Sequence, residues 1–305
     1  MAHFFAEENL KRLKSAKIIG PQTFDCQWMF MRFRIKEVYE KLRGFYHWNI
    51  KKRFHIEIKV ADHCNLNCIG CSHFSPIAQE HFYDVNNYKN DCKRLAELAG
   101  KYIPKIRLLG GEPLLHKDIV SIMEITRNNF GKSFIRMVTN GILLDRMPAE
   151  FWESCKKNNI IITITPYPIN LNVKRIAELA HTYGVTVRNS GDSYKMEFLK
   201  FQYDINGTQN IKNTFNKCTM KRCHQLYEGK IYMCTPPTCI KYINNHFQKE
   251  FKVTANDYLD IYQIENVKVL LNYLRKPIPF CRYCNTNVKN KVLWGASKKE
   301  IEEWL

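Results

Sequence analysis

Residues 54–71 read FHIEIKVADHCNLNCIGC, and the rest of the chain is interpreted outward from this stretch. Its first half alternates apolar and polar residues, which is the period of a β-strand. Its second half places Cys64, Cys68 and Cys71 in the spacing CxxxCxxC, on one loop directly after the strand. Three thiolates on one loop can surround a metal centre. A zinc ion would need a fourth ligand, whereas a [4Fe–4S] cluster held by three cysteines keeps one iron open.

Strands and helices are predicted to alternate downstream with a period of roughly 25–30 residues, which is typical of βα units around a parallel sheet or barrel. We expect strands at 54–60, 106–110, 134–140, 160–165, 185–189 and 197–203, and helices at 86–99, 118–129, 148–157 and 172–183. The stretch 204–305 breaks this rhythm with six cysteines, a hairpin-like QLYEGKIYMC and helical stretches near 256–275 and 297–304. The sequence therefore predicts an α/β domain at 54–205 and a small appended domain at 206–305.

The composition limits the class of protein. Of 305 residues, 45% are hydrophobic and 25% charged, so the chain can bury a sizeable core and global disorder is excluded. No apolar run reaches the roughly 18 residues of a membrane span. The first residues are charged and lack the apolar core of a signal peptide. We therefore expect a cytoplasmic protein.

The charge is strongly basic, with 47 Lys and Arg against 29 Asp and Glu, a formal net charge of +18. Such a chain attracts anions, such as nucleic acid, phosphorylated metabolites or acidic lipid headgroups. A solvated, lysine-rich surface is the alternative interpretation. The extension 1–53 is basic and aromatic-rich, and its predicted helix either contacts a membrane surface peripherally or packs on the domain behind it.

The twelve cysteines do not fit structural disulfides in the cytosol. Three of them, Cys26, Cys92 and Cys155, stand alone and are interpreted as small buried hydrophobes. The other nine lie in three groups along the chain, at 64–71, 218–239 and 281–284.

Polar or glycine-rich tips follow the predicted strands, at the edge of the sheet where the cysteine loop lies and where ligands gather in parallel βα folds. These tips are Gly110-Gly111-Glu112-Pro113, Thr139-Asn140-Gly141, Thr165-Pro166-Tyr167 and Arg188-Asn189. The two glycines of the first tip would let a ligand approach the backbone, and Glu112 can accept a hydrogen bond from an ammonium group. A turn before a helix explains the GGEP segment equally well.

Motif, order and strand context together resemble the radical S-adenosylmethionine (SAM) superfamily over about residues 54–205. CNLNCIGC corresponds to the CxxxCxxC loop of that family, and GGEP to its SAM-binding motif. The resemblance implies a partial (βα)6 barrel. It also implies a [4Fe–4S] cluster whose open iron binds SAM and whose electron cleaves it to methionine and a 5′-deoxyadenosyl radical, which takes a hydrogen atom from the substrate.

The resemblance also implies roles for individual residues. Cys64, Cys68 and Cys71 would ligate the cluster, and the Gly110-Gly111-Glu112 segment would hold the methionine end of SAM. Asn140 and the tip at Tyr167 are weaker candidates for the ribose, carboxylate or adenine. The family usually has an aromatic residue just before the third cysteine, where this chain has Gly70. Phe74 is the candidate to cover the adenine instead.

The later cysteines resemble the twitch, or truncated SPASM, module of some radical SAM enzymes. That resemblance implies an auxiliary [4Fe–4S] cluster with four ligands, Cys218, Cys234, Cys281 and Cys284. A zinc site with the same ligands, or a set that uses Cys223 or Cys239, remains an alternative. These two spare thiols are candidate hydrogen-atom donors for an epimerase, or simply packed, reduced cysteines.

A fully ligated auxiliary cluster can move electrons but cannot bind substrate at an open iron. We therefore expect dehydrogenation or epimerisation of a small hydroxylated substrate, of carbohydrate, cyclitol or nucleotide-sugar type, with an anionic handle suggested by the charge. Maturation of a ribosomally made peptide and RNA modification are the alternatives, and nucleic acid is the less favoured partner because no RNA-binding motif is found. A non-enzymatic zinc or iron–sulfur protein would leave the strand tips unexplained.

A flavodoxin or ferredoxin electron donor is implied by the resemblance. The candidate substrate contacts are Glu57, Lys59, His73, His116, Arg136, Tyr167 and Arg188.

Overall fold

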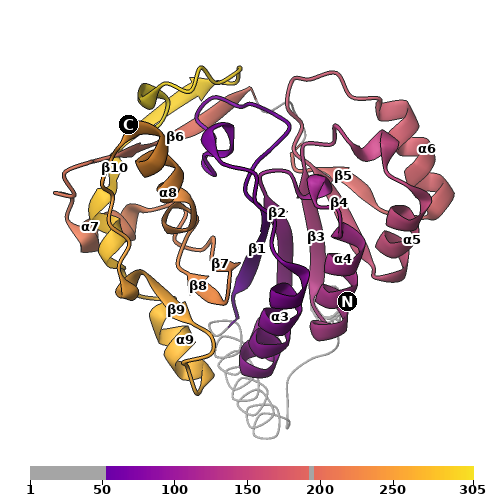
Figure 1. Cartoon of the computed structure of the whole chain (residues 1–305), viewed down its shortest axis with the longest axis horizontal. Helices are drawn as coiled ribbons and strands as arrows, with labels where there is room; N and C mark the ends of the chain where they lie inside the picture. The colour runs from indigo at the N-terminus through magenta and orange to yellow at the C-terminus, as the bar shows by residue number, and fades with distance from the viewer. Residues whose placement is uncertain (1–52, 192–195) are drawn as a thin grey trace, which may run out of the picture. The chain divides into compact units, whose positions relative to one another are not determined.

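The computed structural model describes residues 53–191 and 196–305 (Figure 1). The predicted N-terminal extension lies outside the described residues, apart from Arg53, and so does Cys26. None of the described helices combines the length and apolar character needed to cross a membrane.

Five parallel strands lie side by side in the order in which they occur in the sequence. They are β1 (His55–Ala61), β2 (Lys105–Gly110), β3 (Phe134–Thr139), β4 (Ile160–Ile164) and β5 (Val187–Asn189). The connecting helices are α3 (Val85–Ala99), α4 (Ile119–Asn129), α5 (Ala149–Lys157) and α6 (Val173–Tyr183). The predicted α/β fold with a parallel sheet is confirmed, and each of these elements begins and ends within two residues of its predicted bounds.

The two faces of this sheet differ in character. One face consists of Ile, Leu, Val and Met side chains such as Ile58, Leu108 and Met137, which are fully buried in the main hydrophobic core beneath the helices. Because successive side chains of a strand point to opposite sides, the alternate residues form a second face. Glu57 and Arg107 face each other across β1 and β2 on that second face, which we call the inward face. A strongly polar face is unusual for a parallel sheet, which is normally apolar on both sides.

A sixth parallel strand comes from the C-terminal part of the chain. β7 (Gln225–Tyr227) pairs with β1, on the side away from β2. β8 (Lys230–Tyr232) returns antiparallel to β7, and β9 (Tyr258–Asp260) adds the last strand of the sheet. Glu228 and Gly229 form the hairpin turn with φ values of 48° and 72°, as a two-residue type I′ turn requires. The predicted hairpin is confirmed, and the sheet continues past the predicted domain boundary at 205.

The stretch 197–203 was expected to be the last strand of this sheet, and that expectation is wrong. It forms β6 (Glu197–Tyr203), which pairs antiparallel with β10 (Cys284–Leu293) in a separate two-stranded sheet. A strand buried inside a parallel sheet needs a nearly continuous apolar run. The sequence EFLKFQY is interrupted by Lys200 and Gln202, which suits a ribbon with one solvated side.

A second hydrophobic cluster lies between β6, β10 and the C-terminal helices, on the side of the described chain opposite to α4–α6 in Figure 1. These helices are α7 (Ile211–Lys217), α8 (Pro236–Phe247) and α9 (Val267–Tyr273). Within the predicted helical stretch 256–275, α9 and a short 3₁₀ turn form, and 297–304 forms only the 3₁₀ turn Ile301–Glu303. Helices α7 and α8 were not predicted. Cys92 and Cys155 are buried in the main core as expected.

Candidate active site

Side-chain nitrogen donors contact two sulfur atoms of the cysteine loop that follows β1. The Asn140 side-chain amide lies 3.5 Å from Sγ of Cys64, and the indole Nε1 of Trp294 donates to Sγ of Cys68 at 3.4 Å. Burial raises the pKa of the Cys64 thiol to about 12. Thiolate ligands of metal centres are commonly supported by such outer hydrogen bonds. The chemistry of the loop therefore fits thiolates that are neutralised by iron.

The segment 294–304 packs over this loop and had no predicted link with it. Cys68 forms a β-bridge with Ala296, and the backbone N–H of Ser297 donates to the carbonyl of Asn67 at 2.9 Å. The Nε1 of Trp304 donates to the carbonyl oxygen of Cys71 at 3.0 Å. The cysteine loop is thus held by residues that lie more than 200 positions further along the chain.

The backbone conformation accounts for Gly70 at the position before the third cysteine. Gly70 has φ 64°, which favours glycine, whereas a Cβ there would make only an ordinary contact, at 3.7 Å, with the carbonyl of Glu303. Phe74 is fully buried and packs edge-to-face against Tyr203 and Trp304 in the second hydrophobic cluster. A contact between Phe74 and adenine would therefore require these packing partners to move.

The glycines of the GGEP segment are required by the neighbouring strand. A Cβ on Gly110 would lie 2.1 Å from the carbonyl oxygen of Ala61, and one on Gly111 would lie 1.8 Å from that of His63. The backbone N–H of Gly111 donates to Ala61 at 2.8 Å. These glycines were expected to let a ligand approach the backbone. In the structure they are needed because the backbone of Ala61 and His63, at the start of the cysteine loop, lies directly against them.

Glu112 is almost completely buried, and its carboxylate connects the tips of β2 and β3. Its carboxylate accepts hydrogen bonds from the Thr139 hydroxyl at 2.7 Å and from the backbone N–H groups of Asn140 at 2.9 Å and Leu114 at 3.1 Å. Burial raises the pKa of Glu112 to about 7, although these donors oppose the shift. Glu112 thus positions Asn140, whose side chain in turn donates to Asn65 of the cysteine loop at 2.8 Å.

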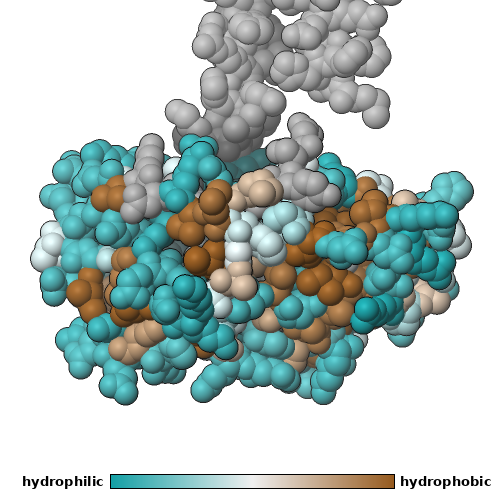
Figure 2. Space-filling model, turned by 90° about the horizontal axis from the view of Figure 1, so that it is seen from above, coloured by the Kyte–Doolittle hydropathy of each residue, from teal (hydrophilic) through white to brown (hydrophobic). Residues whose placement is uncertain are grey.

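A pocket of about 740 Å³ opens at the carboxyl ends of β4 and β5. Its walls include Tyr167, Leu171, Ile176 and Asn189, and hydrophobic side chains gather over this part of the molecule in the view of Figure 2. Tyr167 stacks on Trp294 with ring centroids 6.2 Å apart. Burial raises the pKa of Tyr167, and the nearby thiols of the cysteine loop add to the shift. The pocket thus has the size and lining of a small-molecule site, and its wall residue Tyr167 contacts Trp294, which in turn donates to Cys68.

Comparison with known proteins identifies this arrangement. The family model of the Radical SAM superfamily matches residues 58–189, from β1 to the end of β5. Residues 58–189 form a radical SAM domain. Such a domain binds SAM and a [4Fe–4S] cluster, and Cys64, Cys68 and Cys71 are the residues that would hold the cluster.

Curated relatives and solved structures are similar to parts of the chain. A GTP 3′,8-cyclase of Chlorobaculum tepidum is 38% identical over 92 residues, which is 30% of this chain and 27% of that protein. The enzyme of the same name from Tolumonas auensis is 33% identical over 115 residues, which is 36% of this chain and 33% of that protein. The chain thus spans about a third or less of the length of these relatives. The crystal structure of BtrN in complex with AdoMet and 2-DOIA aligns with a TM-score of 0.48 at 16% identity, over 76% of this chain and 93% of BtrN.

The inward face of the radical SAM domain carries most of the predicted substrate contacts. Glu57 accepts a hydrogen bond from Arg107 at 2.8 Å, and Arg107 pairs in register with Arg136 on β3. Arg107 was not among the predicted substrate contacts. Its position between Ile106 and Leu108 on a predicted strand could have indicated that its side chain points to the face opposite the hydrophobic core. His116 is not on this face. Its ring is buried and lies 2.9 Å from the Tyr83 carbonyl, so the expectation of a substrate contact there is wrong.

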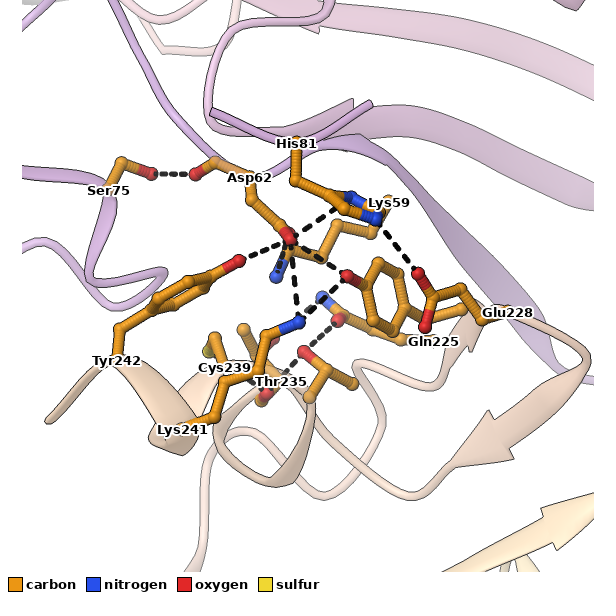
Figure 3. Close-up of polar contacts among 12 residues, drawn as sticks. Lys59, Asp62, Ser75, His81, Gln225, Glu228, Thr235, Cys239, Lys241 and Tyr242 are labelled. Atoms are coloured by element: carbon orange, nitrogen blue, oxygen red, sulfur yellow. Dashed lines mark hydrogen bonds and ion pairs between the residues drawn. The ribbon is translucent and has the colours of Figure 1, made fainter. Parts of the chain in front are cut away.

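Asp62 is the centre of a buried polar network at the end of β1 (Figure 3). Its carboxylate forms an ion pair with Lys59 and accepts hydrogen bonds from the hydroxyls of Tyr242 and Tyr227, the latter at 2.8 Å. Asp62 and Lys59 are both fully buried. Burial acts to raise the pKa of Asp62, but Lys59 and the hydroxyls outweigh it and hold the pKa below its ordinary value. The network joins the radical SAM domain to α8 and the β7–β8 hairpin.

The later cysteines gather on the C-terminal side of the radical SAM domain. Cys218 follows α7, Cys234 follows β8, and Cys281 and Cys284 flank the start of β10. Cys234, Cys281 and Cys284 belong to the second hydrophobic cluster. Burial raises the pKa of Cys284, and the neighbouring Cys281 and Cys218 raise it further. Among residues 53–191 and 196–305, no three Cys, His, Asp or Glu side chains are arranged to hold a single metal ion.

The two spare cysteines occupy different places. Cys239 is fully buried in the first turn of α8, and its thiol lies 3.3 Å from the Thr235 carbonyl and 3.8 Å from that of Ser72 (Figure 3). Cys223 is partly exposed. Burial raises its pKa to about 12, with Glu57 and Arg107 of the inward face among the charges that act on it.

Proposed function

We propose that this protein uses its radical SAM domain to abstract a hydrogen atom from a small, hydroxylated and anionic substrate bound at the inward face. The main observation that supports this proposal is the position of the cysteine loop. It lies at the carboxyl edge of the sheet, next to a polar inward face with basic side chains. The GTP 3′,8-cyclases, whose name specifies a phosphorylated ribose compound, support a substrate of this chemical class. When bound, SAM and the cluster supply the 5′-deoxyadenosyl radical.

The chain's own residues would complete the reaction. A secondary alcohol that loses a hydrogen atom from carbon becomes a ketone when it then loses one proton and one electron. The electron would pass to the auxiliary cluster that we propose on Cys218, Cys234, Cys281 and Cys284. Glu57 is already paired with Arg107 at 2.8 Å, in the half of the inward face away from the cysteine loop, so the proton would pass to solvent water.

Epimerisation is the second proposed outcome and would use a thiol to return a hydrogen atom to the other face of the same carbon. Cys223 suits this role better than Cys239, since Cys223 is partly exposed and close to the charges of the inward face. Cys239 has no exposed surface. The electron donor for either reaction is proposed to be a cytoplasmic flavodoxin or ferredoxin.

Metal analysis and two alanine variants test the proposal. Anaerobically reconstituted protein is expected to hold about eight irons per chain as two [4Fe–4S] clusters. Cys64→Ala should abolish the formation of 5′-deoxyadenosine from SAM with dithionite as reductant. Cys281→Ala should keep SAM cleavage while losing about half of the iron and all net turnover. Zinc as the only bound metal would rule the proposal out.

The substrate class is tested with candidate substrates in deuterated water. Dehydrogenation gives a product two mass units lighter, and epimerisation places deuterium at a stereocentre through an exchangeable thiol. Replacing Cys223 by Ala should stop the second reaction and leave SAM cleavage intact. Hydrogen abstraction from a precursor peptide or an RNA, and from no sugar or nucleotide, would favour the alternatives instead.

A further inference from the structure

Four basic side chains lie close together on the inward face, in the half of the sheet away from the cysteine loop. Arg107 and Arg136 are direct register partners on β2 and β3. Lys105 lies two residues before Arg107 and therefore points to the same side. Arg188 on β5 pairs with Thr163, which pairs with Val138, two residues after Arg136. Three strands, β2, β3 and β5, thus contribute three arginines and one lysine to a single surface, which we call the basic row.

The charge of the basic row is largely uncompensated by the described residues. Arg107 has an ion pair with Glu57 at 2.8 Å. Within residues 53–191 and 196–305, no carboxylate forms an ion pair with Lys105, Arg136 or Arg188. The Nε atom of Arg136 is buried and has no hydrogen-bond partner among these residues. Such a nitrogen atom costs free energy until an acceptor reaches it.

Mutual repulsion within the row lowers the pKa values of Arg136 and Lys105. Burial lowers the pKa of Arg136, and the positive charges of Arg188 and Arg107 lower it further. The pKa of Lys105 is lowered by burial and by Arg136, Arg107 and Arg188. An anion among these groups would relieve both the repulsion and the lost solvation.

The side chains of the row are also held in place. The guanidinium carbons of Arg136 and Arg188 lie 5.0 and 5.5 Å from the ring centroid of Phe134, within the range of a cation–π contact. One ring therefore holds two arginines beside each other. Planar guanidinium groups bind the oxygen atoms of a phosphate in pairs, which an isolated lysine cannot do.

We propose that the basic row binds a phosphate group of the substrate, with Arg136 and Arg188 as its main ligands. This proposal rests on the proposed function, in which the substrate lies on the inward face. Arg136 lies three residues before the end of β3, which is about 10 Å along the strand. The phosphate would therefore lie at the opposite end of the substrate from the carbon that loses hydrogen, as in a sugar phosphate or a nucleotide.

Calorimetric titration of the anaerobic, full-length holoprotein with inorganic phosphate tests the site. We expect saturable binding to the wild type, and at least tenfold weaker binding to Arg136→Gln and to Arg188→Gln. The matched control is Arg175→Gln, which removes the same charge from the exposed side of α6 and should bind phosphate as the wild type does. Acetate should bind at least tenfold more weakly than phosphate.

The outcomes separate this proposal from the general basicity of the chain and from the proposed function. Equal loss of phosphate binding in all three variants would assign the binding to the overall charge of +18 and would overturn the proposed site. Unchanged phosphate binding to Arg136→Gln and Arg188→Gln would also overturn it. SAM cleavage with dithionite is measured in parallel in the wild type and in Arg175→Gln, where it should be equal. Absence of SAM cleavage in the wild type would refute the proposed function and leave the phosphate result standing.

Discussion

At the scale of single residues, Trp294 is the most informative side chain of the site. It lies outside the radical SAM domain, yet its indole N–H donates to Sγ of Cys68. Hydrogen bonds to the sulfur atoms of an iron–sulfur cluster raise its reduction potential, because they stabilise the more negative, reduced state. Trp294 is therefore expected to influence how readily the cluster accepts the electron that cleaves SAM.

Replacing Trp294 by Phe should lower the reduction potential of this cluster. A hydrogen bond worth ~1 kcal/mol corresponds to a shift of roughly 40 mV for a one-electron couple. The measurement is a redox titration followed by electron paramagnetic resonance in a Cys281→Ala background, where the signal of the first cluster stands alone. Trp304→Phe is the control, since that indole donates to the Cys71 carbonyl and not to a sulfur. Equal shifts in both variants would show that loop packing, and not the N–H to sulfur bond, sets the potential.

The three cysteines that we propose as cluster ligands could be grouped from the sequence because their relation is local, within eight residues of one loop. Trp294 could not be predicted, since 226 positions separate it from Cys68 and no spacing rule covers such a distance. The same holds for Gly70. Its departure from the family pattern was visible in the sequence, but its reason, a backbone φ of 64°, appears only in the structure.

At the scale of elements, β1 and β2 depend on glycine where their ends meet. A Cβ on Gly111 would collide with the backbone of His63, which cannot move away as a flexible side chain could. Gly111→Ala should therefore destabilise the protein by ~2 kcal/mol or more and impair cluster assembly. Gly131→Ala is the matched control, because its Cβ would approach nothing closer than 4.0 Å. Chemical unfolding and iron content provide the two measurements, and equal behaviour of the two variants would contradict the collision.

Hydrophobic periodicity predicted β1 to β5 and their helices because each element carries its own pattern. It could not assign strands to sheets. The strand 197–203 was found at its predicted position but pairs with β10, and its place as sixth parallel strand is taken by the three residues of β7. A strand of three residues is too short for a periodic signal. Helix α8 begins with Pro236-Pro237, and such a pair was not recognised as the first turn of a helix.

At the scale of the whole molecule, the Asp62 network connects the radical SAM domain to the C-terminal elements. Asp62→Asn leaves the fully buried ammonium group of Lys59 without its counter-charge. Removal of one partner of a buried ion pair typically costs ~3–5 kcal/mol, so we expect a large fall in thermal stability. The double variant with Lys59→Met should recover most of the loss, because no buried charge then remains. A double variant as unstable as the single one would show that the tyrosine hydrogen bonds, and not the charge pair, stabilise this junction.

His224 makes the same junction sensitive to acid. It lies beside β1, its Nδ1 lies 2.9 Å from the Met233 carbonyl, and burial lowers its pKa to about 4. Between pH 6.5 and 4 the unfolded chain binds a proton that the folded chain does not, so stability falls as the pH decreases through this window. From pH 7 to 5 the loss attributable to His224 is about 2 kcal/mol. Thermal midpoints of the wild type and His224→Gln at both pH values provide the test. An acid-induced decrease of the same size in the variant would exclude His224 as its source.

The contact between the segment 294–304 and the cysteine loop also has a consequence for biosynthesis. The ribosome synthesises the cysteine loop some 230 residues before the segment 294–304 that packs over it. The three thiols therefore stay accessible while the intervening chain is translated. Iron delivery can thus precede closure, and the β-bridge between Cys68 and Ala296 would then form over a centre that is already assembled. A newly made chain released before residue 294 would have its sulfur atoms exposed to oxygen.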